Sequence, residues 1–287
     1  MKNAPLATNL GVALLVLSAL TFSTAGIFTK AVSADAWSVI FWRGLSGLIF
    51  SVIFLMLRGK LRDELRRFGP PAVLATLIGA SGTAAFIPAF KLTSVANVSL
   101  IWATAPFLAA LLAWVTIKER PTRWVVLCSL LALIGVLITV SGSLGSASLL
   151  GDMLAFWMTL MMAGMMVLYR LWPDTPTVLP AAASSLVLLA PAIWVSDPIQ
   201  VADFEIGILI LFGLVFSVAS ITLVEGARRV PSAQAALISL LETPLAPLWA
   251  LILLREAPTL QAIIGGAIIM GAVLLSERKR VRTGALA

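Results

Sequence analysis

Apolar stretches of about 20 residues follow one another along almost the whole chain, and they restrict it to a helical membrane fold. A helix needs about 20 apolar residues to cross the hydrocarbon core of a bilayer. Because lipid cannot hydrogen-bond to the backbone, each crossing segment must satisfy its N–H and C=O groups internally. Charged residues and Pro/Gly breaks separate ten such stretches, at 9–29, 37–57, 71–90, 95–116, 123–141, 149–169, 177–195, 205–225, 232–254 and 259–276. We therefore expect an all-α integral membrane protein with ten transmembrane helices.

Composition supports this class and leaves little room for any other domain. The 287 residues are 60% hydrophobic and only 11% charged, whereas about a quarter of the residues in a soluble domain are charged. Ten spans of about 20 residues take roughly 200 positions. The remaining connections are too short to form a soluble catalytic or receptor domain.

One phrase occurs twice, about half a chain apart. Residues 92–122 read LTSVANVSLIWATAPFLAALLAWVTIKERPT, and residues 229–259 read RVPSAQAALISLLETPLAPLWALILLREAPT. Both copies begin at a Ser-containing turn, carry a Pro in mid-helix (Pro106 and Pro244), and end on base–acid–x–Pro–Thr. The copies open the fourth and ninth stretches, so each half has five helices, and an odd number inserts the second half upside down. We expect two inverted five-helix repeats, residues 1–145 and 146–287.

The basic residues predict the orientation. With a cytoplasmic N-terminus, sixteen of the 20 Lys and Arg residues fall in inside connections and three in outside ones, and Arg43 lies within a span. This is a strong positive-inside bias, which places both termini in the cytoplasm. The net charge of +7 is thus explained by topology and by anionic lipid headgroups. Membrane lipid is an expected partner, and nucleic acid is not.

An N-terminal secretory signal that ends near residues 31–34 is the alternative for the first span. Its apolar run, residues 10–29, is longer than the roughly 7 to 15 residues of a signal h-region. Removal of this helix would also destroy the five-plus-five symmetry. We therefore interpret it as the first transmembrane helix.

The residue inventory argues against an enzyme. The chain has no His, and its single Cys128 lies within an expected span, so it offers neither a disulfide nor a Cys- or His-based metal site. No GxxxxGK[ST] phosphate loop occurs. We expect no metal, no cofactor and no use of ATP by this chain.

Two charged residues lie more than one helical turn from either end of an expected span. Arg43 is either a snorkelling or internally paired residue, or a cavity cation that binds a substrate carboxylate or stabilises a gate. Glu242 lies near the bilayer centre, where a carboxyl group must be protonated, paired or hydrated. The simplest expectation is a pair between Arg43 and Glu242. In that case Glu242 has a structural or gating role and carries no obligatory proton.

Several residues near the duplicated Pro positions are candidates for a substrate cavity. Ser99, Trp102, Ser239 and Glu242 lie about one turn before these breaks, so we expect them to face inward. Trp157 is one of the deeper Trp residues, and it either lines the cavity or faces lipid.

The two Pro residues suggest a mechanical role. Pro106 and Pro244 remove helix hydrogen bonds in the middle of the fourth and ninth spans. The carbonyl groups that they free are tolerated only where protein or cavity water satisfies them. These positions are therefore candidate hinges, with a rigid kink as the alternative.

The motifs resemble those of a known family. They are Phe-x-Arg in the second span, AFKLTSVAN at 89–97, WATAPFLAALLAW at 102–114, and LETPLAPLWAL at 241–251. Over its whole length the chain resembles the EamA-type branch of the drug/metabolite transporter superfamily, and within it the YddG-type amino acid exporters. The resemblance implies export of neutral amino acids, aromatic ones included, by alternating access through a central cavity. It also implies a bacterial-type inner (plasma) membrane.

Two other functions remain open from the residues. A nucleotide-sugar or other phosphorylated-metabolite exchanger of the same fold needs cations in its cavity, and only Arg43 qualifies clearly. A non-transporting scaffold or scramblase would insert in the membrane without saturable solute flux. The oligomeric state is not determined by the sequence, and a monomer is compatible with it.

We predict that Lys118 and Glu277 face the cytoplasm and that Arg255 faces the opposite side, because of the basic bias and the odd number of helices in each half. Single cysteines at these positions, in a Cys128→Ala background, are labelled with a membrane-impermeant thiol reagent from each side. Positions 118 and 277 should react only from the cytoplasmic side, and position 255 only from outside. Reaction of 118 and 255 from the same side would contradict the inverted repeat.

Overall fold

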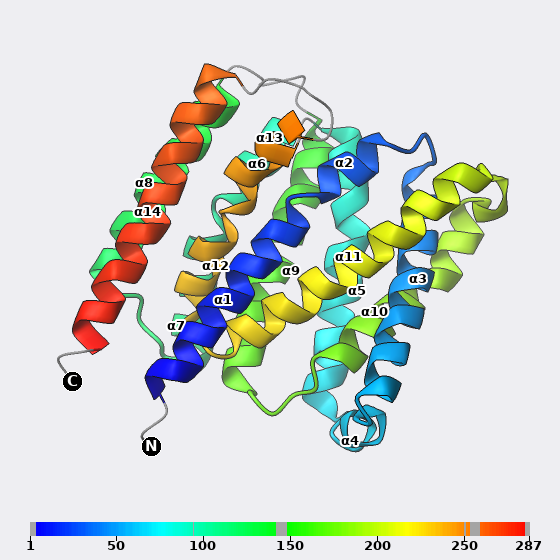
Figure 1. The fold of residues 1–287 in the computed structure, drawn as a ribbon, viewed down its shortest axis with the longest axis horizontal. Helices are drawn as coiled ribbons and strands as arrows, with labels where there is room; N and C mark the ends of the chain where they lie inside the picture. The colour runs from blue at the N-terminus through cyan, green and yellow to red at the C-terminus, as the bar shows by residue number, and fades with distance from the viewer. Residues whose placement is uncertain (1–3, 94, 142–147, 250, 253–258, 285–287) are drawn as a thin grey trace.

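A computed structural model describes residues 4–93, 95–141, 148–249, 251–252 and 259–284, and within them every regular element is a helix (Figure 1). The elements are α1 (Ala4–Phe22), α2 (Ala25–Lys30), α3 (Ala36–Leu57), α4 (Leu61–Arg66), α5 (Pro70–Leu92), α6 (Val95–Trp102), α7 (Ala105–Ile117), α8 (Arg123–Val140), α9 (Leu149–Leu171), α10 (Val178–Val195), the 3-10 turn η1 (Pro198–Gln200), α11 (Asp203–Ala227), α12 (Ser232–Ser239), α13 (Glu242–Trp249) and α14 (Leu260–Gly284).

Eight segments of the described chain are long and apolar enough to cross a membrane. They are Asn9–Thr29, Ala36–Leu57, Pro70–Leu92, Asn97–Ile117, Leu149–Leu171, Val178–Val195, Asp203–Ala227 and Leu260–Arg278. Two of the ten expected spans are absent from this set. The stretch 123–141 forms α8, whose apolar part is shorter, and the stretch 232–254 is divided between α12 and α13. The second-copy pair Arg255–Glu256 lies outside the described residues.

Both duplicated stretches are interrupted in the middle. Residues 103–104 separate α6 from α7, and residues 240–241 separate α12 from α13. Pro106 and Pro244 each lie in the first turn of the second short helix. At that position a backbone N–H has no partner within the helix, so Pro loses nothing there, while it prevents the preceding helix from continuing. The expected mid-span breaks are therefore present.

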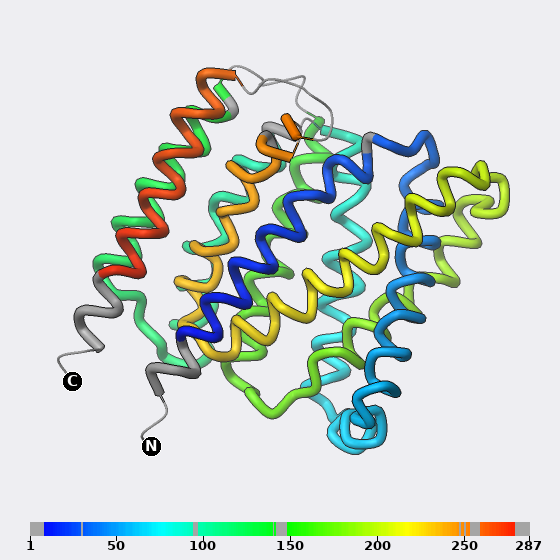
Figure 2. Tube along the Cα trace, in the orientation of Figure 1, coloured from blue at the N-terminus to red at the C-terminus, as the bar shows by residue number. Residues whose placement is uncertain are grey.

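The helices pack mostly across the two halves of the sequence. At one side of the bundle α8 lies along α14, and at the other side α3 packs on α10 (Figure 1). Between these pairs α1 packs on α11, α5 on α9, and α7 on α12. The trace in Figure 2 shows α8 and α14 side by side over most of their length. The core of the protein is thus formed between the halves.

Glycines allow the paired helices to approach closely. A Cβ atom on Gly265 of α14 would lie 2.3 Å from the carbonyl oxygen of Gly135 in α8. A Cβ on Gly226 of α11 would lie 2.6 Å from Cγ of Leu15 in α1. Small residues at helix contacts are a common way to bring backbones together in lipid, where packing replaces much of the hydrophobic driving force.

The first base–acid–x–Pro–Thr motif forms a turn that connects three helices. Lys118 adopts a left-handed conformation, with φ of 56°, and ends α7. The Glu119 carboxylate accepts hydrogen bonds from Nε of Arg170 and from the backbone N–H of Ser232, each at 3.1 Å. Thr122 caps α8 with its hydroxyl. This first copy of the motif therefore has a structural role, because it joins α7 to the end of α9 and the start of α12.

We predict that Gly265→Ala lowers the free energy of unfolding by about 1–3 kcal/mol, because the new methyl group overlaps backbone atoms of α8. Gly271, on the same helix, has no neighbouring atom within 4 Å of the position that a Cβ atom would take. The matched variant Gly271→Ala should leave stability unchanged or raise it by up to about 1 kcal/mol, since Ala favours helix more than Gly. Thermal unfolding in detergent measures both. Equal melting temperatures for the two variants would contradict the close α8–α14 contact.

Candidate functional site

A cavity lies inside the bundle. The centres of water molecules could occupy about 110 Å³ of it. Helices α1, α3, α5, α9, α10 and α11 form its walls. Trp102 and Ser239, the last residues of α6 and α12, also line it, as does Glu242, the first residue of α13. The breaks in the duplicated stretches therefore border the cavity, and both halves of the chain contribute to it.

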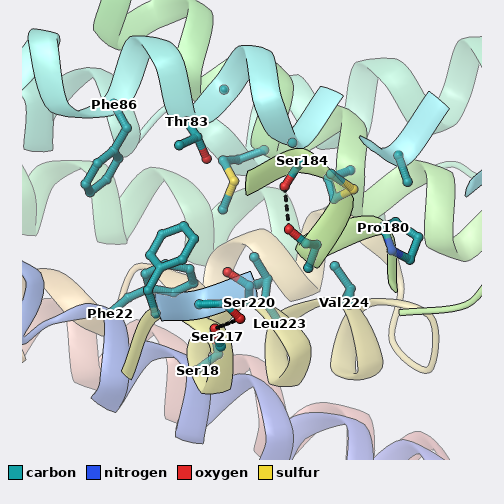
Figure 3. A pocket seen from close by; sticks show the side chains of 18 of the residues that line it. Ser18, Phe22, Thr83, Phe86, Pro180, Ser184, Ser217, Ser220, Leu223 and Val224 are labelled. Atoms are coloured by element: carbon teal, nitrogen blue, oxygen red, sulfur yellow. Dashed lines mark hydrogen bonds between the residues drawn. The ribbon is translucent and has the colours of Figure 1, made fainter. Parts of the chain in front are cut away.

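Aromatic and sulfur-containing side chains form much of the apolar wall. Phe22 of α1 and Phe86 of α5 lie across the cavity from each other in Figure 3. Phe22 meets Phe216 of α11 edge to face, with ring centroids 5.5 Å apart. The remaining members of this wall include Trp102 and the α9 methionines Met158, Met162 and Met165. Such a surface suits a partly apolar ligand, because rings and thioethers give it large contact area.

Hydroxyl groups provide most of the polar lining. They belong to Ser18, Ser51, Thr83, Thr177, Ser184, Ser185, Ser217, Ser220 and Ser239. Several of them donate their proton to a backbone carbonyl: Ser18 to Ala219 at 2.9 Å, Ser184 to Ala181 at 2.7 Å, and Ser217 to Gly213 at 2.8 Å. Ser239 donates likewise to the carbonyl of Ala235, at 3.0 Å. A hydroxyl whose proton is used in this way can only accept a further hydrogen bond.

Glu242 is the only acidic or basic residue among the described residues that line the cavity; Tyr169 is the other lining group that can ionise. The Glu242 side chain is half-buried and makes no hydrogen bond or ion pair with any described residue. The Tyr169 hydroxyl donates to the carbonyl oxygen of Pro176 at 2.9 Å. A carboxyl group therefore faces the cavity with its oxygen atoms available to a ligand or to water.

Arg43 is buried against an aromatic ring that lines this cavity, and it is not itself among the described lining residues. Its guanidinium carbon lies 4.0 Å from the ring centroid of Phe216, which lines the cavity, and 5.4 Å from that of Phe212. The side chain is only 2% exposed, and Nε and Nη1 have no hydrogen-bond partner among the described residues. Contact with two ring faces attracts the cation through the ring quadrupole.

The expected pair between Arg43 and Glu242 is therefore wrong for this structure. The ion pairs of the described chain join Glu119 to Arg170, and Glu225 to Arg228 and Arg229. The physical reason is placement. Glu242 opens onto the cavity at the α12–α13 break, whereas Phe212 and Phe216 enclose the Arg43 guanidinium between α3 and α11.

The structure brings together three of the six residues expected at the substrate site, namely Trp102, Ser239 and Glu242. Arg43, Ser99 and Trp157 are not among the described lining residues. Trp157 is 45% exposed, and its indole N–H donates to the Ser81 hydroxyl at 2.7 Å between α9 and α5.

Apart from Ser239, the hydroxyl lining was not predicted from the sequence, and neither were the three Phe residues. Ser217 and Ser220 are spaced i, i+3, which places both on one face of α11. That spacing in the sequence indicates a polar stripe on an apolar helix. Whether such a stripe faces a cavity or a neighbouring helix depends on packing, which the spacing alone does not determine.

Apolar helices arranged around a cavity, with interrupted helices at its border, define the class of multi-pass membrane transporters. The sequence model of the EamA-like transporter family matches the chain twice, at residues 9–141 and 145–277, so the chain belongs to this family. The chain is also similar to a Bacillus subtilis (strain 168) protein named uncharacterized transporter YyaM, with 29% identity over 196 residues. That alignment covers 64% of this chain and 63% of the relative. One solved crystal structure has the same fold, with a TM-score of 0.82 and 20% identity over 95% of this chain and 98% of the other.

We predict that Arg43→Met raises the free energy of unfolding by about 1–4 kcal/mol, because a buried charge without a counter-ion is replaced by an apolar chain of similar length. Arg43→Lys is the matched control. It keeps the charge but loses the planar group that stacks on the rings, so it should unfold at a lower temperature than wild type. Thermal unfolding in detergent distinguishes the two. A lower melting temperature for Arg43→Met would show that Arg43 has a stabilising polar partner in the membrane.

Proposed function

We propose that this protein is a secondary transporter that exports small neutral metabolites, with neutral amino acids, aromatic ones included, as the main substrates. The observation that carries the proposal is the cavity lining, which consists of aromatic rings, hydroxyls and one carboxyl group. No Lys or Arg is among the described lining residues. A phosphorylated substrate would need such cations, because phosphate is bound in proteins mainly by Arg, Lys and metal ions. The alternative of a phosphorylated-metabolite exchanger is therefore not favoured.

We further propose that the chain has ten spans in two inverted repeats, residues 1–145 and 146–287, with both termini in the cytoplasm of a bacterial-type cell. The two matches to the family model support this division. The helix contacts support it too, because they correspond when the halves are exchanged. Contact α1–α11 corresponds to contact α9–α5, and contacts α3–α10 and α8–α14 each join equivalent helices.

Alternating access is supported by a helix contact that is made in one half of the chain but is at most weak between the equivalent helices of the other half. Helix α9 packs on α11, near the end of the bundle where both helices terminate, whereas their equivalents α1 and α5 make at most a weak contact within the described chain. Glu119, Arg170 and the start of α12 are joined at that same end. In an inverted repeat whose two ends are packed differently, exchanging the conformations of the two halves gives a second state, in which the tightly packed end opens and the other end closes. We propose that the half-helices at Pro106 and Pro244 are hinges in this change.

The substrate site in this proposal is formed by Trp102, Ser239 and Glu242, which border the cavity at the helix breaks. Arg43, Ser99 and Trp157 make no contribution to the site in this conformation. Trp102 presents a large aromatic surface, and its indole N–H is a buried donor without a partner among the described residues. A substrate carbonyl or carboxylate group could accept that hydrogen bond, since a buried donor left unpaired costs free energy.

The test is counterflow in proteoliposomes. Purified protein is reconstituted into vesicles loaded with unlabelled amino acid, and uptake of the labelled compound is followed without ATP. We expect exchange of aromatic and aliphatic amino acids, no exchange of sugar phosphates, and none in protein-free vesicles. Exchange of a phosphorylated sugar without exchange of any neutral amino acid would refute the proposed substrate class, and absence of all solute flux would refute transport of these solutes.

A further inference from the structure

The cavity is lined by an acidic residue, whereas the chain as a whole is basic. The protein has a net charge of +7, yet Glu242 is the one carboxyl group and no Lys or Arg is present among the described lining residues. Arg43 is 2% exposed, lies against the ring of Phe216 and is not among the described lining residues. A ligand that enters therefore meets a carboxyl group without a counter-ion.

Four of the nine lining Ser and Thr hydroxyls have the same preference. Ser18, Ser184, Ser217 and Ser239 use their protons on helix carbonyls, at 2.7 to 3.0 Å, and present only acceptor lone pairs to the cavity. An ammonium group has three N–H donors and no acceptor, whereas a carboxylate has only acceptors. Most of the bonded hydroxyl lining is thus complementary to an ammonium group.

Aromatic faces add a third contribution. Phe22, Phe86 and Trp102 line the cavity, and the faces of aromatic rings attract cations, most strongly outside water. The apolar wall also covers a hydrocarbon or aromatic substituent on the ligand. The cavity therefore combines the carboxyl group of Glu242 with a large apolar surface.

We propose that Glu242 is the ammonium-binding residue of the cavity, and that its ligand class is apolar amines, in which a carboxylate group is dispensable. This inference rests on the proposed transport function and deepens it by stating which group of an amino acid is recognised. An amino acid ester, whose carbonyl oxygen can still accept the indole N–H of Trp102, binds at least as tightly as the parent amino acid. A carboxylic acid of the same shape without the amine binds much more weakly.

The test uses four probes with the same phenyl group: phenethylamine, L-phenylalanine methyl ester, L-phenylalanine and 3-phenylpropionate. Binding to the full-length protein in detergent is measured by isothermal titration calorimetry at constant sodium concentration and pH. We expect the ester to bind with a Kd equal to or below that of the amino acid. For 3-phenylpropionate we expect affinity lower than that of phenethylamine by about 10- to 100-fold, the contribution of one charge-assisted hydrogen bond.

Three variants assign this preference to Glu242. Glu242→Gln should lower amine affinity by about 10- to 100-fold and bring it close to that of 3-phenylpropionate. Glu242→Asp retains the charge and should retain the order of affinities, so it also tests whether a change at this position merely prevents folding. Asp203→Asn is the matched control, because Asp203 is an exposed acid at the start of α11 and is not a lining residue. It should bind all four probes as wild type does.

Equal binding of phenethylamine and 3-phenylpropionate, or a folded Glu242→Gln protein with wild-type amine affinity, would overturn the proposal. A second result would also overturn it: sodium ions displace phenethylamine from the wild-type protein but not from Glu242→Asp or Glu242→Gln. In that case the site binds an inorganic cation. Failure of this proposal can be distinguished from failure of the proposed transport function, which the counterflow test measures. If phenylalanine exchanges across vesicles but phenethylamine does not bind, transport stands and ammonium recognition by Glu242 fails.

Discussion

Inside a bilayer no backbone N–H or C=O group can rely on water from the lipid side, and this constraint determines where the helices of this protein can break. The two interruptions, at residues 103–104 and 240–241, do not face lipid alone; their neighbours Trp102, Ser239 and Glu242 line the central cavity. The cavity and the broken helices are thus one feature. A site at the breaks is the part of a transmembrane helix where polar backbone can coexist with an aqueous or ligand-filled space.

The bundle is held together mainly by contacts between the halves. Helices α1, α3, α5 and α8 each pack on a helix from the second half, and at Gly265 the approach to Gly135 leaves no room for a methyl group. Neither half encloses the cavity alone, because α1, α3 and α5 supply one part of its wall and α9, α10 and α11 the other. A relative movement of the two halves would therefore change the cavity directly.

The chain accommodates its buried and half-buried charges by three different means. Arg43 lies against two aromatic rings, and Glu242 faces the cavity. Glu119 and Glu225 are paired with Arg residues at the end of the bundle where α7 and α11 terminate. Each arrangement reflects the local surroundings, since a charge in a low-dielectric region needs a partner, a ring face or water. Only the charge that faces the cavity remains available to a ligand.

The sequence alone determined the membrane class, the helical architecture and the duplicated helix breaks, because hydropathy, span length and Pro positions act locally along the chain. It also identified Trp102, Ser239 and Glu242, since they adjoin those breaks. Only the tertiary structure decided which face of each helix points inward, so it placed Arg43 against Phe216 and left Glu242 without a counter-ion among the described residues. An apolar span has no polar face that marks its inner side, and the rotation of each helix is set by packing against its neighbours.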